Sequence, residues 1–255
     1  MKNGLIVLFV VFLTTQVHCQ EKERILMVGN SFTFYYNLPM TLELMGKEKG
    51  LDWKVHQSTA GGATLKQHWE GEKALKTRKK IKRSKYTQII FQEHSTYPLK
   101  AIDSTQKYLN KLFKASNQNA QKNLYATWSY PGILGESKVP ESKSNAIEKA
   151  LNSIKPTINT EILPVGRAFD LFQLKYPKTS LFTSDSKHPN PIGSYLAACV
   201  IFSSISKQSS KGLARRVASK SKKGKQVYYY IVEREMAKKC QQIADEILRY
   251  GNTSE

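Results

Sequence analysis

Short apolar runs rich in β-branched residues alternate along the chain with longer stretches in which apolar residues recur every three or four positions. A short apolar run bounded by Gly, Asn or Ser is typical of a buried strand, and the longer period is typical of one helix face. Because the two patterns alternate, they predict a parallel sheet covered by helices. The five strands are expected at residues 24–29, 53–58, 88–92, 123–128 and 161–165.

Helical periodicity fills the stretches between and after these strands. The economical arrangement is a right-handed, three-layer α/β/α sandwich around a five-stranded parallel sheet, with ligands bound beyond the carboxyl ends of the strands. The loops after the first four strands should therefore share one rim. We expect helices at residues 38–49, 102–115, 143–154, 167–174, 192–205 and 228–250.

Residues 1–19 have the pattern of a secretory signal peptide. One positive charge precedes an apolar run from Leu5 to Leu13, and polar residues follow up to Cys19. A membrane-spanning helix needs about 20 apolar residues, and no later segment approaches that length. We therefore expect cleavage after Cys19, export to the periplasm or the extracellular space, and a single domain at residues 20–255. Lipidation of Cys19 is the alternative, which the bulky His18 before it disfavours.

Composition adds a strong positive charge to this picture. The formal net charge is +20, from 40 Lys and Arg against 20 Asp and Glu, and much of it lies at residues 73–85 and 207–225. Such runs are usually solvated faces or loops, and a functional interpretation requires an anionic partner such as an acidic polysaccharide. Charge alone does not predict specific nucleic-acid binding.

Cysteine and other metal-ligating residues give no sign of a cofactor. Two cysteines remain after residue 19, and Cys199 and Cys240 each lie in a helical stretch, where a disulfide and a pair of buried thiols are equally ordinary. No group of His, Cys and carboxylates has the spacing of a zinc site, and no Gly-rich loop suggests phosphate binding. We therefore expect neither a metal nor another cofactor.

Two segments carry residues suited to nucleophilic catalysis. Ser31 ends a Gly-Asn-Ser triplet after the first predicted strand, where a sharp turn into a helix exposes a hydroxyl. Asp185 and His188 stand three residues apart in a later loop. A serine becomes a good nucleophile when a histidine accepts its proton and a carboxylate holds the other imidazole nitrogen. Each segment alone also suits a turn or a helix cap, but together they predict a catalytic triad.

The order of these motifs resembles that of the SGNH/GDSL hydrolases. Gly-Asn-Ser follows the first strand, Gly-Gly-Ala-Thr follows the second, and Asp-x-x-His-Pro stands near the end, so the resemblance covers most of the chain after residue 19. It implies a flavodoxin-like SGNH fold, with Ser31 as nucleophile, His188 as base and Asp185 as orienting acid. It also implies that backbone N–H groups of Ser31 and Gly62 contribute to an oxyanion hole.

One motif departs from that family. Its third block normally reads Gly-x-Asn-Asp, and the asparagine side chain donates a hydrogen bond to the oxyanion, whereas this chain has Phe-Gln-Glu-His at residues 91–94. We expect Gln92 to supply the same amide on a longer arm. Loss of one oxyanion donor typically costs about 100- to 1000-fold in rate, so this position bears on the efficiency of the enzyme.

Residues beside the expected site suggest the substrate. Asn30, His94 and Trp128 are candidate substrate contacts, and aromatic residues at the rim, core residues by default, also suit stacking on a sugar. We expect an exported serine esterase that removes acyl groups, acetyl first of all, from a carbohydrate through an acyl-enzyme. The alternatives are a lipase, thioesterase or acyltransferase with the same triad, and a non-catalytic module that binds an anionic glycan. The oligomeric state is left open.

Overall fold

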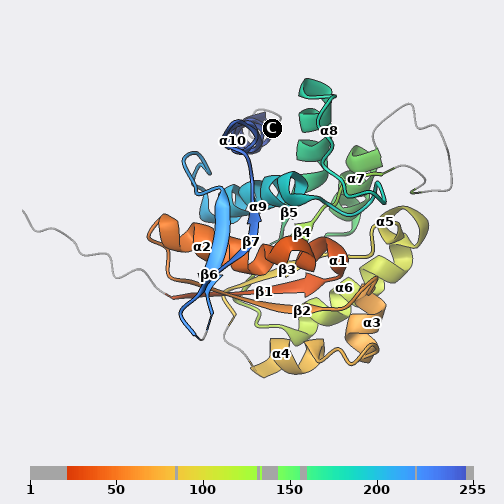
Figure 1. Cartoon of the computed structure of the whole chain (residues 1–255). Helices are drawn as coiled ribbons and strands as arrows, with labels where there is room; N and C mark the ends of the chain where they lie inside the picture. Colours follow the sequence, from red (N-terminus) through yellow and green to blue (C-terminus); the bar gives the residue numbers. More distant parts are fainter. Residues whose placement is uncertain are drawn as a thin grey trace, which may run out of the picture.

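A five-stranded parallel sheet forms the centre of the molecule (Figure 1). The computed structural model describes residues 22–83, 86–130, 133, 143–155, 160–221 and 223–250, so the expected signal peptide lies outside the described residues. The strand order is β2-β1-β3-β4-β5, which confirms the predicted five-stranded parallel sheet. The strands are β1 (Glu23–Gly29), β2 (Trp53–Thr59), β3 (Gln88–Phe91), β4 (Gln121–Tyr125) and β5 (Thr160–Leu163).

Strand β1 lies between two neighbours, and the candidate nucleophile follows its carboxyl end. It pairs with β2 on one side and β3 on the other. The four apolar residues from Ile25 to Val28 are fully buried because helices cover both faces of the sheet. A strand buried on both faces has a continuous apolar run and not an alternating one, which is why the sequence pattern identified it.

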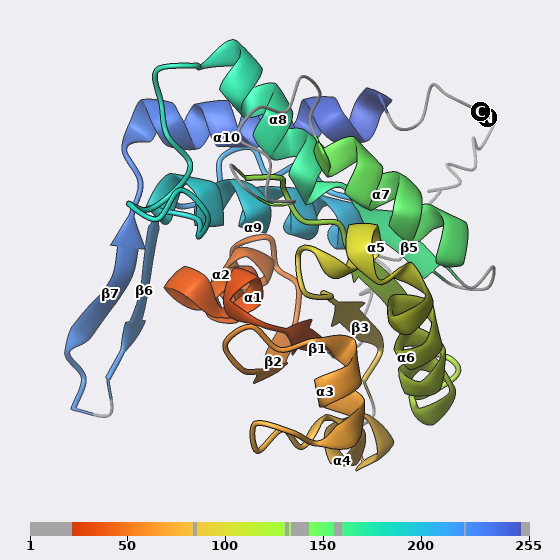
Figure 2. The ribbon, with the colours of Figure 1, turned by 90° about the vertical axis from the view of Figure 1, so that its right-hand side faces the viewer.

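Helices cover both faces of this sheet (Figures 1 and 2). One apolar core packs the sheet against α3, α4, α6 and α7, and a second core packs its other face against α1, α2, α8 and α9, with α10 on the outer side of α9. The predicted three-layer sandwich is thus confirmed. The helices are α1 (Ser31–Phe34), η1 (Tyr35–Asn37), α2 (Leu38–Glu48), α3 (Leu65–Glu70), α4 (Thr77–Arg83), α5 (Tyr97–Lys100), α6 (Ile102–Ala115), α7 (Lys143–Ile154), α8 (Val165–Lys175), α9 (Pro191–Ser206) and α10 (Arg234–Tyr250).

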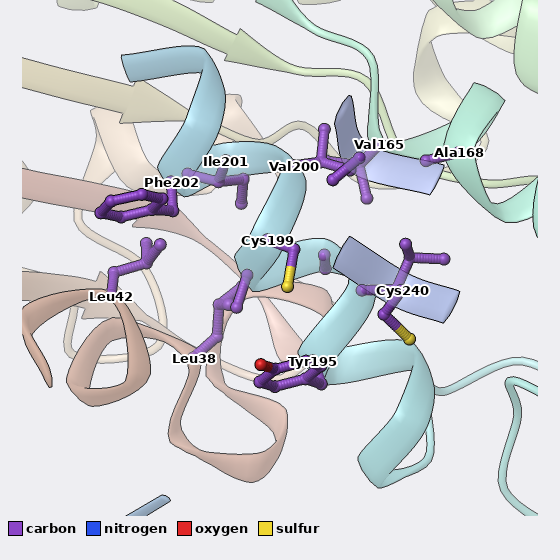
Figure 3. Packing of buried hydrophobic residues seen from close by; sticks show 14 of the residues in the cluster. Leu38, Leu42, Val165, Ala168, Tyr195, Cys199, Val200, Ile201, Phe202 and Cys240 are labelled. Atoms are coloured by element: carbon purple, nitrogen blue, oxygen red, sulfur yellow. The ribbon is translucent and has the colours of Figure 1, made fainter. Parts of the chain in front are cut away.

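Helix α9 is buried on nearly all sides. Figure 3 shows its side chains among Leu38 and Leu42 of α2 and Val165 of α8. Cys199 of α9 and Cys240 of α10 are both buried free thiols, and burial raises the pKa of Cys199 to about 12. Of the two states that the sequence left open, the structure has the thiols. Within the described residues, no helix combines the length and apolar character needed to cross a membrane.

The C-terminal part corrects one sequence-based expectation. The helix expected at residues 228–250 begins only at Arg234, and the residues before it form an antiparallel hairpin of β6 (Arg216–Lys220) and β7 (Gln226–Ile231). The run Val-Tyr-Tyr-Tyr-Ile in β7 favours a strand, because β-branched and aromatic side chains fit a pleated surface. Val217 and Tyr230 are buried against the body of the molecule and anchor the hairpin there.

Candidate active site

Ser31 begins helix α1 directly after strand β1, in a turn fixed by Asn30. The Asn30 side chain caps the helix by accepting a hydrogen bond from the Phe32 N–H (3.1 Å), and its Nδ2 donates to the Ala63 carbonyl (3.1 Å). Asn30 is only 3% exposed. The prediction that Asn30 contacts substrate is therefore wrong for this structure: its side chain joins the nucleophile turn to the loop after β2.

Gln92 holds the same turn from the end of strand β3. Its Oε1 accepts hydrogen bonds from the Asn30 N–H (2.9 Å) and the Thr33 hydroxyl (3.0 Å), while its Nε2 donates to the Glu93 carbonyl. The atom that faces a backbone N–H must be an acceptor, which fixes the orientation of the amide. Because Gln92 is fully buried and its amide N–H is turned to the main chain, the structure corrects the prediction of an oxyanion donor. Gln92 positions the nucleophile turn instead.

A buried histidine that sequence analysis did not single out for the site supports strand β1 from the α3 side. One ring nitrogen of His68 lies 3.0 Å from the Gly29 carbonyl, and the other lies 2.7 Å from the Thr77 hydroxyl. Burial lowers the pKa of His68 to about 4, so the ring is neutral and donates to the carbonyl from Nε2. The local sequence signals only a helix cap at Thr64, because the partners of His68 are distant in sequence.

The loop between α8 and α9 fixes the candidate acid. Oδ1 of Asp185 accepts three hydrogen bonds, from the N–H groups of Lys187 (2.9 Å) and His188 (2.9 Å) and from the Thr183 hydroxyl (2.8 Å). These bonds leave Oδ2 facing the His188 ring. The hydrogen bond from the His188 side chain, aided by these donors, holds the pKa of Asp185 well below its usual range, so the carboxylate stays ionised.

The structure brings Ser31, His188 and Asp185 together in one hydrogen-bonded chain. The Ser31 hydroxyl lies 2.8 Å from Nε2 of His188, and Nδ1 of the same ring lies 2.5 Å from Oδ2 of Asp185. A carboxylate only accepts, so Nδ1 carries the proton and Nε2 presents a lone pair to the hydroxyl. The His188 side chain is 19% exposed, which leaves room for a substrate to approach.

Aromatic rings enclose the imidazole on two sides. Tyr35 stacks on the His188 ring, with centroids 4.3 Å apart and planes at 10°. The Phe32 ring forms a T-shaped pair with the same imidazole, with centroids 5.6 Å apart and planes at 81°. The sequence suggested rim aromatics as sugar platforms, but one face of the Tyr35 ring is occupied by His188. The stack restricts rotation of the imidazole about its side-chain bonds.

Trp128 also holds the loop between α8 and α9 in place. Its Nε1 donates to the carbonyl of Lys187 (3.0 Å), and its ring lies between Phe32 (4.5 Å) and Phe169 (4.2 Å) in a nearly parallel stack. Trp128 is fully buried, so the prediction that it contacts substrate is wrong for this structure. It fastens the backbone next to His188 to the end of strand β4.

Gly62 lies in the loop that Asn30 ties to the nucleophile turn. Its φ of 59° is in the left-handed region that favours glycine, and the Ala63 N–H closes the turn by donating to the Ala60 carbonyl (3.1 Å). The Ser31 N–H is the first of helix α1 and has no acceptor within the helix. The bond from Asn30 to the Ala63 carbonyl places the loop that contains Gly62 beside the turn that begins at Ser31.

His94 and Glu93 border the site after strand β3. His94 is partly buried, its Nδ1 lies 3.1 Å from the Thr96 hydroxyl, and burial, together with the charges of Lys187 and Lys73, lowers its pKa. Glu93 is 6% exposed, and its Oε1 accepts from the N–H groups of Leu65 (3.0 Å) and His94 (2.6 Å). Glu93 thus links this strand end to the start of α3, a role that the sequence did not indicate.

Comparisons with known proteins show what the fold resembles. No protein-family profile and no curated protein matches the sequence. A DUF4886 family protein from Bacteroides uniformis has a similar structure, with a TM-score of 0.66 at 17% identity over 92% of this chain and 98% of that one. A protein from Slackia heliotrinireducens assigned to the SGNH hydrolases has a TM-score of 0.58 at 24% identity, over 72% of this chain and all of its own.

A third similar structure is the psychrotrophic esterase EstA from Pseudoalteromonas sp., with a TM-score of 0.51 at 18% identity over 73% of this chain and 98% of that one. At these identities the likeness is one of fold.

In the part of the chain that the structure describes, no group of three or more His, Cys, Asp or Glu is arranged to hold a metal ion.

Proposed function

We propose that this chain, which has the α/β fold of the SGNH/GDSL hydrolases, is an exported serine esterase that removes acyl groups, acetyl first of all, from a carbohydrate. The observation that carries the proposal is the hydrogen-bonded chain from Ser31 through His188 to Asp185, at 2.8 and 2.5 Å. This arrangement activates a serine for acyl transfer. The similarity to the esterase EstA supports an ester as the substrate.

Acylation of the enzyme begins with attack of the Ser31 hydroxyl oxygen on the ester carbonyl carbon. Nε2 of His188 accepts the hydroxyl proton, and the ionised Asp185 stabilises the imidazolium that forms. Backbone N–H groups of Ser31 and Gly62 donate to the oxyanion of the tetrahedral intermediate. When the intermediate collapses, the carbon–oxygen bond to the sugar breaks, and the departing oxygen takes the proton from His188.

In deacylation, water replaces the Ser31 hydroxyl as the nucleophile, and the serine oxygen becomes the leaving group. His188 removes a proton from a water molecule, whose oxygen attacks the acyl carbon of Ser31. Collapse of the second intermediate breaks the bond to the serine oxygen, which recovers its proton from His188. The free acid leaves, and the hydrogen-bonded chain is restored.

Residues around the triad support a carbohydrate as the substrate. Tyr130 lies beside Phe32 and Tyr97 beside His94, and both tyrosines are partly exposed. Such rings present an apolar face with a polar tip. The expected export of the chain would bring it into contact with cell-surface or extracellular glycans. Acetyl groups are small, which suits a triad whose imidazole is itself partly covered by Tyr35 and Phe32.

Substitution of the nucleophile tests the proposal. Ser31→Ala should lower kcat on p-nitrophenyl acetate by at least about 10⁴-fold, because no hydroxyl remains to form the acyl-enzyme. Ser184→Ala, an exposed serine in the triad loop, is the matched control and should keep full activity. Circular dichroism should show both variants folded, and mass spectrometry should find a fluorophosphonate label on Ser31 of the wild type.

Three results would reject parts of the proposal. Unchanged ester cleavage by Ser31→Ala would reject Ser31 as the nucleophile, and absence of activity in the wild type would favour a non-catalytic module. A preference for long over short acyl chains among p-nitrophenyl esters would reject the deacetylase. Release of acetate from acetylated polysaccharides then identifies the sugar.

A further inference from the structure

The β6–β7 hairpin projects from the body of the molecule beside α1 and α2 (Figure 2). Its strands and turn span residues 216–231, which contain five Lys or Arg and no Asp or Glu. Arg216, Lys220, Lys223 and Lys225 are exposed, and none of them forms an ion pair with another described residue. The hairpin therefore presents positive charge that the body of the protein does not neutralise.

The outer face of the hairpin combines these charges with apolar side chains. Arg216 lies opposite Ile231, Ala218 opposite Tyr228, and Lys220 opposite Gln226. Directly opposite residues share one face of an antiparallel pair, and so do alternate residues along β6. A register shift between Val217 and Ala218 inserts Tyr229 as an extra residue in β7, so Tyr228 and Ile231 lie on one face and Tyr230 on the other. This outer face is defined by Arg216, Lys220, Tyr228 and Ile231, of which Tyr228 and Ile231 are each half exposed. The Cα atoms of Arg216 and Lys220 are about 13 Å apart along the strand, so the two side chains suit an elongated ligand.

The inner face fastens the hairpin next to the candidate active site. Tyr230 packs against Tyr36 of η1, with ring centroids 5.8 Å apart, and its hydroxyl lies 3.2 Å from that of Thr41. Tyr36 directly follows Tyr35, whose ring stacks on His188. The hairpin is therefore anchored to the segment whose neighbouring residue contacts the candidate base.

We propose that the outer face of the hairpin binds an anionic polysaccharide, the polymer that carries the ester, and holds it beside Ser31. Lysine and arginine pair with the carboxylates or sulfates of such a chain, and the Tyr228 ring packs on a sugar. The proposal rests on the proposed function, since it names the class of its substrate. A lipid membrane fits less well, because interfacial segments present several Trp, Phe or Leu side chains, and this face has only Tyr228 and Ile231.

Charge reversal on the hairpin tests the proposal through binding to polygalacturonate, measured by titration calorimetry. The combined change Arg216→Glu, Lys220→Glu and Lys223→Glu should raise the dissociation constant about tenfold or more. The control combines Lys79→Glu and Lys82→Glu on α4 with Lys76→Glu just before it, which alters net charge equally and should leave most of the affinity intact. Activity on p-nitrophenyl acetate should be unchanged in both variants, and this readout also verifies their folding.

Kinetics on the polymer give an independent readout. With acetylated polygalacturonate, the hairpin variant should show a higher KM and an unaltered kcat, because binding is weakened away from the reacting atoms. Tyr228→Ala should raise KM in the same direction. If the charge-reversed variant does not fold, Arg216→Gln, Lys220→Gln and Lys223→Gln provide the milder test.

Several outcomes would overturn the proposal. These are equal loss of affinity in both variants, no binding of polygalacturonate by the wild type, or tighter binding to a DNA duplex or to phosphatidylserine-containing vesicles than to polygalacturonate. Failure of the proposed function is distinguishable from these outcomes. If hydrolysis of p-nitrophenyl acetate does not depend on Ser31 but polymer binding depends on the hairpin, the binding face stands and the esterase does not.

Discussion

At the scale of single residues, Tyr35 differs from what was expected of the rim aromatics, because its ring packs on His188 and is not free on that face to stack on a sugar. Its ring lies flat on the His188 imidazole, 4.3 Å away, and limits the orientations that the base adopts. Aromatic pairs of this kind contribute about 0.5–1.5 kcal/mol beyond the area that they bury. The stack therefore favours the ring position in which Nε2 faces Ser31.

Removal of the Tyr35 ring should lower kcat. We expect Tyr35→Ala to reduce kcat on p-nitrophenyl acetate about tenfold with a smaller change in KM, because a misplaced base slows proton transfer. Tyr35→Phe keeps the ring and should retain most of the activity. Steady-state kinetics check both variants. A large loss in Tyr35→Phe as well would show that the hydroxyl, and not the stack, is required.

Glu93 makes stability depend on pH in the direction opposite to that of most paired carboxylates. Burial raises the pKa of its carboxyl to about 7, from 4.5 in an exposed chain. Between these two pH values the folded chain keeps a proton that the unfolded chain releases. The free energy of unfolding contributed by Glu93 therefore falls as the pH rises from about 4.5 to about 7.

Replacement of Glu93 by glutamine should remove this dependence. Glu93→Gln keeps an oxygen to accept from Leu65 and His94 but does not ionise. We expect it to raise the free energy of unfolding by up to about 3 kcal/mol relative to the wild type at about pH 8, and by little at about pH 4. Urea unfolding at both pH values measures the difference. The same difference at both values would refute the assignment of the raised pKa to Glu93.

The residues of the site differ in how far the sequence predicted them. Ser31, Asp185 and His188 lie in short local motifs. Once the fold brings these motifs to one rim, the hydroxyl, the imidazole and the carboxylate hydrogen-bond to one another. Gln92 and Trp128 were misjudged because their roles depend on partners distant in sequence. A glutamine in place of asparagine moves the amide inward, where the Asn30 N–H determines its orientation.

At the scale of elements, the loop before α9 is held to that helix by a close approach at Gly193. A Cβ on Gly193 would lie 2.3 Å from the Leu181 carbonyl oxygen and 3.2 Å from Cβ of Pro189. Leu181 and Pro189 are at the two ends of the loop that carries the candidate acid and base, and Phe182 and Pro189 form a β-bridge there. A side chain at position 193 would therefore push this loop away from α9.

Gly193→Ala should disturb both stability and activity. We expect a loss of about 1–3 kcal/mol in the free energy of unfolding, as in other overpacked sites, and a fall in kcat of about 100-fold as the base shifts. Gly61→Ala is the matched control, since its Cβ would meet no atom within 4 Å, and its stability should change by less than about 1 kcal/mol. Denaturant unfolding and steady-state kinetics measure both effects. Wild-type stability in Gly193→Ala would show that the loop adapts freely.

Strands and long helices were predictable because each has a complete local pattern. The predicted ranges agree with β1 to β5 and with α2, α6, α7 and α9 to within a few residues. The first basic run was expected to form a solvated face or a loop, and it contains α4, in which Ile81 is buried. The hairpin was missed because its second strand runs into α10 with no Gly or Pro between them to mark a boundary.

At the scale of the whole molecule, positive charge is distributed unevenly. Much of the excess lies on α4 and on the β6–β7 hairpin, at separate places on the surface (Figure 1). Composition gave the size of this excess but not its location relative to the triad, because that location depends on how the hairpin packs on η1. Only the assembled structure separates a basic face beside the candidate site from one that is remote.

The nucleophile and the base are 157 residues apart in the chain. Ser31 follows the first strand of the sheet, whereas His188 follows only after all five strands. A nascent chain that ends before position 188 has a serine in place but no histidine to accept its proton from the α8–α9 loop. If the proposed function holds, a growing polypeptide stays inert toward esters until it extends past position 188, when all five strands of the sheet have already been made.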